Sequence, residues 1–260
     1  MKCLIGILYS GESQLEACKA AIANQTHTAW DIIQISDLPK KQAHEALYDA
    51  FNKHADKVDL FVKIDADMEL YRNDFLEELT RYFAQNPNTE QLTMKVDDFY
   101  TARNIWGLNV FRSSVVFIEN DAVYTDKAVR INEDKIKRLK RHKTLVPAAR
   151  HGYDPTDYHS FYFGCHKAVK VMHRKSRSHM RNIRRLPLAA ILQRDNRPLI
   201  AYAGAAIAFE KQFEPDWLDR DNGKLQTLFD TLYPSGKFSI TDLLKHYKMV
   251  SKSAKMYLSD

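Results

Sequence analysis

Glycine is scarce in this 260-residue sequence, and its scarcity excludes the common glycine-rich nucleotide-binding loops. There are eight glycines in all, and none forms the G-x-G-x-x-G pattern that binds dinucleotides. The stretch 6–13 comes close to a phosphate-binding P-loop, but Glu12 stands where that loop requires a lysine. Because a carboxylate repels the phosphates that such a loop must hold, we exclude a P-loop here.

Cysteines and long apolar runs are also few. The three cysteines, Cys3, Cys18 and Cys165, lack the spacing of a disulfide framework or of a structural zinc site. We therefore predict that Cys3 and Cys18 are buried free thiols in a reducing compartment. No apolar run approaches the ~20 residues that a membrane-spanning helix requires. Residues 1–9 are too short for a secretory signal, so a cytoplasmic location is expected.

The first half of the chain alternates short apolar runs with amphipathic segments. Apolar runs at 3–9, 30–35 and 60–64 are each followed by a segment with helical periodicity. This β-α-β-α-β order predicts an α/β fold with a doubly wound, mainly parallel sheet. Helical periodicity then dominates the C-terminal part. We predict an α/β region at 1–155, followed by a helical region at 156–260.

Two helix starts are predicted from capping residues. Asn132 precedes a segment, 133–141, with acidic residues at its start and basic residues at its end, an order that suits the helix dipole. Asp154 precedes Pro155, and proline is favoured at the first position of a helix. We therefore expect one helix at 133–141 and another that begins at Asp154.

Two carboxylates follow the third apolar run. Asp65 and Asp67 come directly after residues 60–64, and ligands of α/β proteins bind at the carboxyl ends of such strands. Residues two apart in an extended segment project to the same side. The two carboxylates would therefore repel each other unless a cation lay between them, and hard divalent cations prefer oxygen ligands. The pattern predicts a divalent-metal site that holds a diphosphate, although a helix cap is the commoner origin of such pairs.

The charge balance points to an anionic partner. Formal net charge is +6, and no acidic residue occurs between Asp157 and Asp195 while basic residues accumulate. A solvated helix face is the usual explanation of such a run. The alternative is that residues 166–185 bind an anionic membrane surface, with the protein peripheral on the inner face of the membrane.

Several stretches resemble known glycosyltransferases. The segment 61–68, which contains Asp65 and Asp67, resembles the Asp-x-Asp segment of GT-A glycosyltransferases. The stretches 96–100, 107–112 and 151–168 resemble bacterial family-two-like glycosyltransferases of surface polysaccharide (lipopolysaccharide or capsule) biosynthesis. Together these stretches cover roughly residues 1–210. The segment 133–141 only loosely resembles the Glu-Asp element where the larger family keeps its base.

The resemblance implies transfer of a sugar from a UDP- or GDP-linked donor to a hydroxyl of a glycan or lipid-linked acceptor. It implies that Asp65, Asp67 and His151 hold the metal, with Mn²⁺ preferred over Mg²⁺ because imidazole is a poor magnesium ligand. Asp98 is the first candidate for the catalytic base and Asp134 the second. Tyr9, Ser10, Asp37 and Asp65 would contact the nucleotide, although Ser10 and Asp37 could equally be helix caps.

Two other classes of function remain open from sequence. A nucleotidyltransferase or phosphotransferase would use the same carboxylates with two metals. A nucleic-acid-binding protein would explain the net charge but not Asp65 and Asp67, and we expect no nucleic-acid partner.

Overall fold

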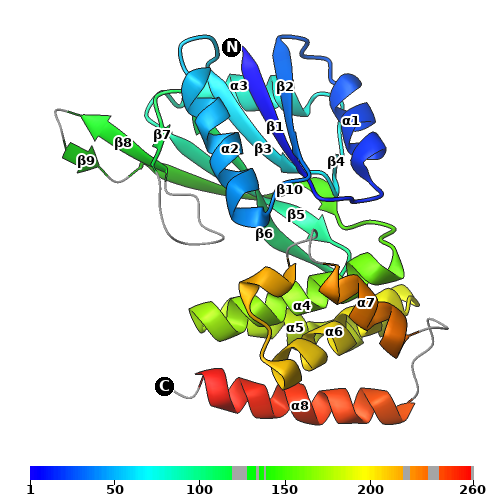
Figure 1. Ribbon diagram of the computed structural model, residues 1–260. Helices are drawn as coiled ribbons and strands as arrows, with labels where there is room; N and C mark the ends of the chain where they lie inside the picture. The colour runs from blue at the N-terminus through cyan, green and yellow to red at the C-terminus, as the bar shows by residue number, and fades with distance from the viewer. Residues whose placement is uncertain (119–127, 133–134, 138, 219–222, 234–239, 259–260) are drawn as a thin grey trace. The chain divides into compact units, whose positions relative to one another are not determined.

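The computed structural model describes residues 1–118, 128–132, 135–137, 139–218, 223–233 and 240–258 (Figure 1). The chain divides into two compact units. The first comprises residues 1–98 and 104–153, and the second comprises residues 99–103 and 154–260. The short stretch 99–103 therefore belongs with the C-terminal helices, whereas the sequence pattern placed it within the α/β region.

The first unit is built on a seven-stranded sheet in the order β2-β1-β3-β6-β5-β10-β4. Its strands are β1 (Cys3–Tyr9), β2 (Trp30–Ser36), β3 (Leu60–Asp65), β4 (Met68–Leu70), β5 (Gln91–Asp98), β6 (Arg103–Arg112) and β10 (Arg141–His151). β1 pairs in parallel with both β2 and β3, and β10 pairs in parallel with β5. β6 runs antiparallel to β3, and β4 antiparallel to β10. The predicted α/β class is confirmed.

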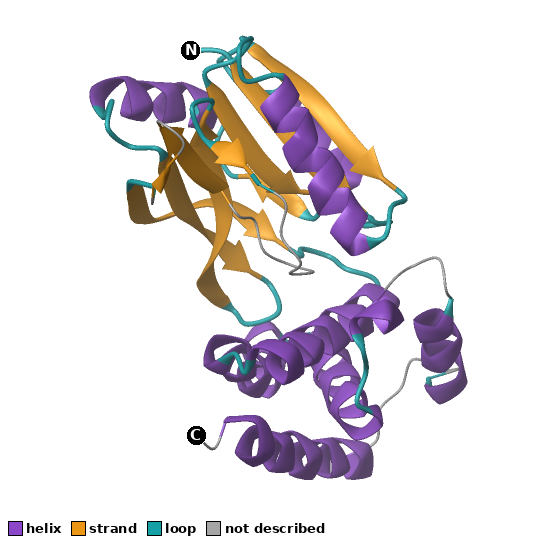
Figure 2. Cartoon of the chain, turned by 60° about the vertical axis from the view of Figure 1, so that its left-hand side comes forward, coloured by secondary structure: helices purple, strands orange, loops and turns teal. Residues whose placement is uncertain are grey.

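Helices cover both faces of this sheet because β1 and β3 present apolar side chains to each side (Figures 1 and 2). α1 (Leu15–Ala23) and α3 (Phe75–Gln85) pack on the face that carries Ile5 and Val62. α2 (Lys40–Lys53) packs on the opposite face, where Phe51 stacks on Phe61 with ring centroids 4.7 Å apart. Cys3, Cys18 and Cys165 are buried and free, as predicted for the first two.

The predicted helix at 133–141 is wrong. Residues 135–137 form β9 (Lys135–Lys137), which pairs with β8 (Ala128–Asn132), and β8 in turn pairs with β7 (Val116–Phe117). Ile131 lies opposite Ile136 in this ladder. Val129 and Ile131 alternate with polar residues, which is the period of a strand. The charge order that favours a helix contributes too little to outweigh strand pairing.

The second unit is helical (Figure 2). Its elements are α4 (Asp157–Arg174), α5 (Arg177–Gln193), α6 (Arg197–Lys211), the 3₁₀ turn η1 (Pro215–Leu218), α7 (Lys224–Leu232) and α8 (Ile240–Leu258). α4 and α6 approach closely at two glycines. A Cβ atom on Gly164 would lie 1.7 Å from the Ala201 carbonyl oxygen, and one on Gly204 would lie 2.2 Å from that of Phe161.

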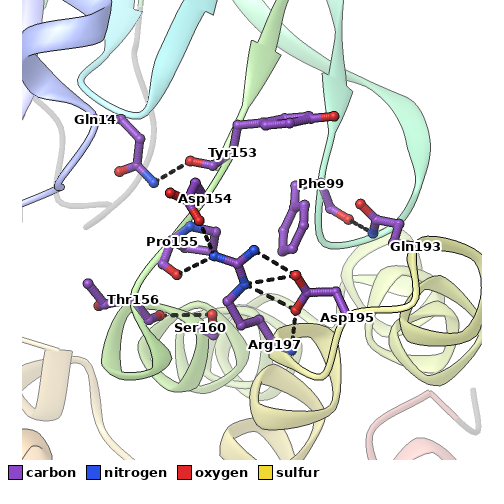
Figure 3. A network of polar contacts seen from close by, with 10 residues as sticks. All are labelled: Gln14, Phe99, Tyr153, Asp154, Pro155, Thr156, Ser160, Gln193, Asp195 and Arg197. Atoms are coloured by element: carbon purple, nitrogen blue, oxygen red, sulfur yellow. Dashed lines mark hydrogen bonds and ion pairs between the residues drawn. The ribbon is translucent and has the colours of Figure 1, made fainter.

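Arg197 ties the start of α6 to the start of α4 (Figure 3). Its guanidinium pairs with Asp195 at 2.6 Å and with Asp154 at 2.5 Å, and it donates to the Pro155 carbonyl oxygen at 3.0 Å. Asp154 adopts a left-handed backbone conformation with φ of 51°. Asp154 is therefore not the helix cap that its sequence context predicts. Thr156 takes that place, and its hydroxyl accepts from the His159 amide at 3.1 Å.

Within the described part of the chain, none of the helices combines the length and the apolar character needed to cross a membrane.

Candidate functional site

The candidate site lies where β1 and β3 end. Leu8 of β1 is in register with Asp65 of β3, and the Ala66 amide continues the contact by donating to the Leu8 carbonyl oxygen at 3.1 Å. A two-residue turn, Ala66-Asp67, then leads directly into β4. The two predicted carboxylates therefore lie at the carboxyl edge of parallel strands, as their sequence position indicates.

Strand register brings His151 to the same edge. His151 is the last residue of β10, opposite Met68 of β4 on one side and Asp98 of β5 on the other. The Gly152 amide donates to the Asp67 carbonyl oxygen at 2.9 Å, which closes the β4–β10 pairing. His151 is consequently held between Asp67 and Asp98, two residues that are 31 positions apart in the chain.

The imidazole of His151 contacts both carboxylates. Its Nδ1 lies 2.7 Å from Asp98 Oδ1, and its Nε2 lies 3.3 Å from Asp67 Oδ2. The Asp98 side chain is completely buried. Because an ionised carboxylate only accepts hydrogen bonds, Nδ1 carries the hydrogen, and in the neutral ring the lone pair of Nε2 then faces Asp67. This is the arrangement in which a carboxylate orients a metal-binding histidine.

Asp67 shows the strongest sign of a missing positive partner. Its Oδ1 is buried and has no hydrogen-bond partner among the described residues. Its Oδ2 faces the Nε2 lone pair of His151, a contact that requires a proton or a cation between the two atoms. Two donors, each about 2.1 Å from one metal and at roughly a right angle, stand about 3 Å apart, close to the 3.3 Å between Asp67 Oδ2 and His151 Nε2.

The electrostatics of the two aspartates differ. Burial raises the pKa of Asp67 to about 6, and the neighbouring carboxylates of Asp65, Glu12 and Asp98 act in the same direction while His151 opposes them. Burial also acts to raise the pKa of Asp65, but the Lys63 ammonium 2.8 Å away outweighs it and holds that pKa well below its usual range. The negative charge of Asp65 is thus balanced by Lys63, whereas among the described residues Asp67 has no such cationic side chain beside it apart from His151.

Asp67 and His151 are the best-placed ligands for a cation at this site. Among the described residues, no group of three or more His, Cys, Asp or Glu side chains already converges as a metal site. One oxygen of the Asp65 carboxylate accepts from the Lys63 ammonium. Asp65 would reach a metal with its other oxygen or through water.

The predicted nucleotide-binding residues lie along the same edge. Tyr9 and Ser36 are in register at the ends of β1 and β2, so Ser10 and Asp37 follow two neighbouring strands. Ser10 Oγ donates to Glu12 Oε1 at 2.6 Å, and the Ser10 amide donates to Glu12 Oε2 at 2.6 Å. Asp37 has a left-handed backbone with φ of 57°. Their contact with a nucleotide stays a prediction.

Of the two predicted bases, the structure describes Asp98 alone. Asp98 is buried and lies 2.7 Å from His151 Nδ1. Asp134 lies outside the described residues. Both assignments stay predictions, and the geometry of Asp98 favours a role in orienting His151.

Sequence reasoning missed Lys63 and Glu12 as members of the site. Lys63 stands two residues before Asp65 in the apolar strand and therefore projects to the same side, a spacing that could have identified the pair. It also missed two polar pairs near the ends of β4, β5 and β10. There Arg150 pairs with Glu69 at 2.7 Å, and Tyr71 Oη donates to Asp97 at 2.8 Å.

Gln14, the residue before α1, ties that helix to the end of β10. Its Nε2 donates to the Tyr153 carbonyl oxygen at 2.6 Å (Figure 3). The segment that follows His151 is therefore held against the start of the first helix.

No protein-family model matches the chain, and no curated protein matches it in sequence. Several solved structures are similar in fold at low identity. CMP:2-keto-3-deoxy-manno-octonic acid synthetase in complex with CTP has a TM-score of 0.31 at 13% identity, over 44% of this chain and 75% of that chain. TarS 1–349 from S. aureus has a TM-score of 0.38 at 9% identity, over 98% of this chain and 92% of that chain. A197 from STIV has a TM-score of 0.31 at 16% identity, over 43% and 65%. Likeness at this level supports no statement about activity.

Proposed function

We propose that the protein is a metal-dependent glycosyltransferase that moves a sugar from a UDP- or GDP-linked donor to a hydroxyl of a glycan or lipid-linked acceptor. The observation that supports it best is the pair Asp67 and His151. Their facing donor atoms are 3.3 Å apart, and Asp67 Oδ1 is buried without a partner among the described residues. The pair lies at the carboxyl edge of parallel strands, where α/β proteins bind their ligands.

In this proposal each residue has a distinct task. Asp67 and His151 would hold the metal, and Asp98 would fix the histidine tautomer in which Nε2 can bind it. A bound Mn²⁺ would supply Lewis-acid stabilisation of the charge on a departing diphosphate. Lys63 keeps Asp65 ionised, so that Asp65 remains an acceptor for water or for a ribose hydroxyl. Tyr9, Ser10 and Asp37 line the base and ribose pocket.

The nature of the donor set favours manganese. Imidazole nitrogen suits first-row transition metals, whereas magnesium prefers oxygen throughout. Asp98 is the first candidate for the catalytic base, but in this proposal it orients His151, whose Nδ1 lies 2.7 Å away. We therefore propose Asp134, the second candidate, as the base.

Calorimetry of UDP and GDP binding tests the nucleotide site. We expect one of them to bind more tightly with Mn²⁺ than with chelator, and we expect Asp67→Ala to remove the difference. Glu69→Gln is the matched control, because Glu69 is an acidic neighbour two residues away that pairs with Arg150 instead. Equal affinities of wild type and Asp67→Ala, with and without metal, would overturn the proposal.

Product analysis then separates sugar transfer from nucleotidyl transfer. With a nucleotide sugar and an acceptor extract, a glycosyltransferase releases a nucleoside diphosphate. A nucleotidyltransferase that joins a nucleoside triphosphate to a sugar releases pyrophosphate. Release of pyrophosphate alone would exclude glycosyl transfer in favour of the second reaction.

A further inference from the structure

The exposed face of α5, a helix of the second unit, combines arginines with aliphatic side chains. At 100° per residue, six residues of α5 fall within an arc of about 100°: Arg177, Arg181, Arg184, Leu188, Ile191 and Leu192. We call them the α5 outer stripe. The remaining faces of the helix supply the packing, because Met180, Ile183, Leu186, Ala189 and Ala190 are buried.

The α5 outer stripe is basic at one end and apolar at the other. Its three arginines occupy the first turns and are exposed. Its three aliphatic residues follow at helical spacing, and Leu188, Ile191 and Leu192 are 42%, 74% and 58% exposed. Single exposed aliphatic side chains are ordinary, whereas contiguous exposed apolar patches are typical of interaction sites.

We propose that this stripe docks the protein on an anionic membrane surface. Helices bind an anionic membrane interface through the apolar area they bury together with the attraction of basic residues to the lipids. In α5 the basic and the aliphatic residues follow one another along a single stripe. The arginines would contact lipid phosphates, and the aliphatic end would enter the boundary between headgroups and acyl chains. The segment 158–194 contains no acidic residue that would weaken the attraction.

Other occupants fit the stripe less well. Nucleic acid would engage the arginines but would leave Leu188, Ile191 and Leu192 exposed to water. A second copy of the chain would bury the arginines of both copies in one interface, to which α5 contributes no acidic partner. An anionic bilayer satisfies both ends of the stripe at once.

The inference refines the sequence-based expectation and is independent of the proposed catalytic function. The basic run at 166–185 includes Lys167 and Lys170 of α4, whereas the stripe is confined to α5 and extends to Leu192. The sequence pattern missed the aliphatic end, because leucine and isoleucine in a helix are more often buried than exposed.

Vesicle co-sedimentation of the full chain tests the proposal. We expect binding to vesicles that contain phosphatidylglycerol and little binding to pure phosphatidylcholine. Arg181→Gln with Arg184→Gln should weaken the partition coefficient roughly 30-fold, since each basic residue near an anionic surface contributes about fivefold. Leu188→Ser with Ile191→Ser and Leu192→Ser should weaken it at least about tenfold.

Matched controls separate docking from general charge and from misfolding. Arg72→Gln with Arg81→Gln removes the same charge from the first unit, where both arginines are exposed, and it should leave binding within about threefold. Arg181→Lys with Arg184→Lys should keep most of the binding. Asp67→Ala should bind vesicles as wild type does, so that failure of the catalytic proposal is distinguishable from failure of this one.

Three results would overturn the inference. The first is no binding of wild type to anionic vesicles. The second is equal binding by wild type and both α5 variants, with folding verified by circular dichroism. The third is a change of oligomeric state in the aliphatic variant without any change in vesicle binding, which would assign the stripe to a second copy of the chain.

Discussion

Replacing Asp98 by asparagine provides the sharpest test of the site, because two roles for Asp98 predict opposite results. The Asp98 carboxylate is completely buried and lies 2.7 Å from His151 Nδ1. If it orients His151, its loss should weaken metal binding. If it is the catalytic base, its loss should stop transfer but leave metal binding intact.

The expected magnitude follows from the geometry of the pair. Asparagine has nearly the shape of aspartate, so the fold should persist, but the hydrogen bond to the imidazole loses its charge. Removing the outer partner of a metal-binding histidine typically weakens metal affinity 10- to 100-fold, equivalent to about 1.4 to 2.7 kcal/mol. We expect a loss of Mn²⁺ affinity in this range.

Electron paramagnetic resonance of free Mn²⁺ during titration measures the affinity directly. Asp97→Asn is the matched control: it is the same chemical change one residue away, at a carboxylate that accepts from Tyr71, and it should leave affinity unchanged. An Asp98→Asn protein that binds Mn²⁺ as wild type does would refute the orienting role, and loss of transfer in that protein would restore Asp98 as the base.

Three further outcomes are expected. Burial raises the pKa of Asp67 to about 6, above ~3.9 in the unfolded chain, so the metal-free protein should lose about 2 to 3 kcal/mol of stability as pH rises from ~4 to ~6. Asp67→Asn should regain this free energy of unfolding, measured by urea unfolding at pH 7.5 with chelator. A variant no more stable than wild type would contradict the burial argument. Burial, together with the charges of Lys167, Lys170 and Arg174, lowers the pKa of His179 to about 3. As pH drops below ~6.5, the free energy of unfolding should therefore decrease, by at most about 1.4 kcal/mol per pH unit. His179→Asn should flatten this pH dependence, and an unchanged slope in that variant would contradict the role of His179. Gly164→Ala should destabilise the second unit by about 1 to 3 kcal/mol or more, because the added methyl would lie 1.7 Å from the Ala201 carbonyl oxygen. Gly223→Ala, with open space but φ of +61°, should cost only about 1 kcal/mol in the same thermal and urea melts, and equal losses would argue against the close approach of α4 and α6.

The sequence by itself determined the elements whose signals are local. The apolar runs at 3–9 and 60–64 became β1 and β3, because β-branched and aromatic residues in short runs favour buried strands. The position of Asp65 at the end of β3, with Asp67 two residues later, placed both at the carboxyl edge. Local signals failed at 133–141, where pairing between strands outweighed the charge order that predicts a helix. They also failed at Asp154, the predicted helix cap, which pairs with the distant Arg197 instead.

Only the tertiary structure decided how the site residues meet. His151 stands beside Asp67 because β10 pairs with β4, and beside Asp98 because β10 also pairs with β5. Register between strands that are distant in the chain is set by packing of the whole sheet, and a single sequence contains no direct record of it. The same holds for α5, where the pattern of apolar residues suggests a buried stripe and only the packing of the unit reveals which residues remain exposed.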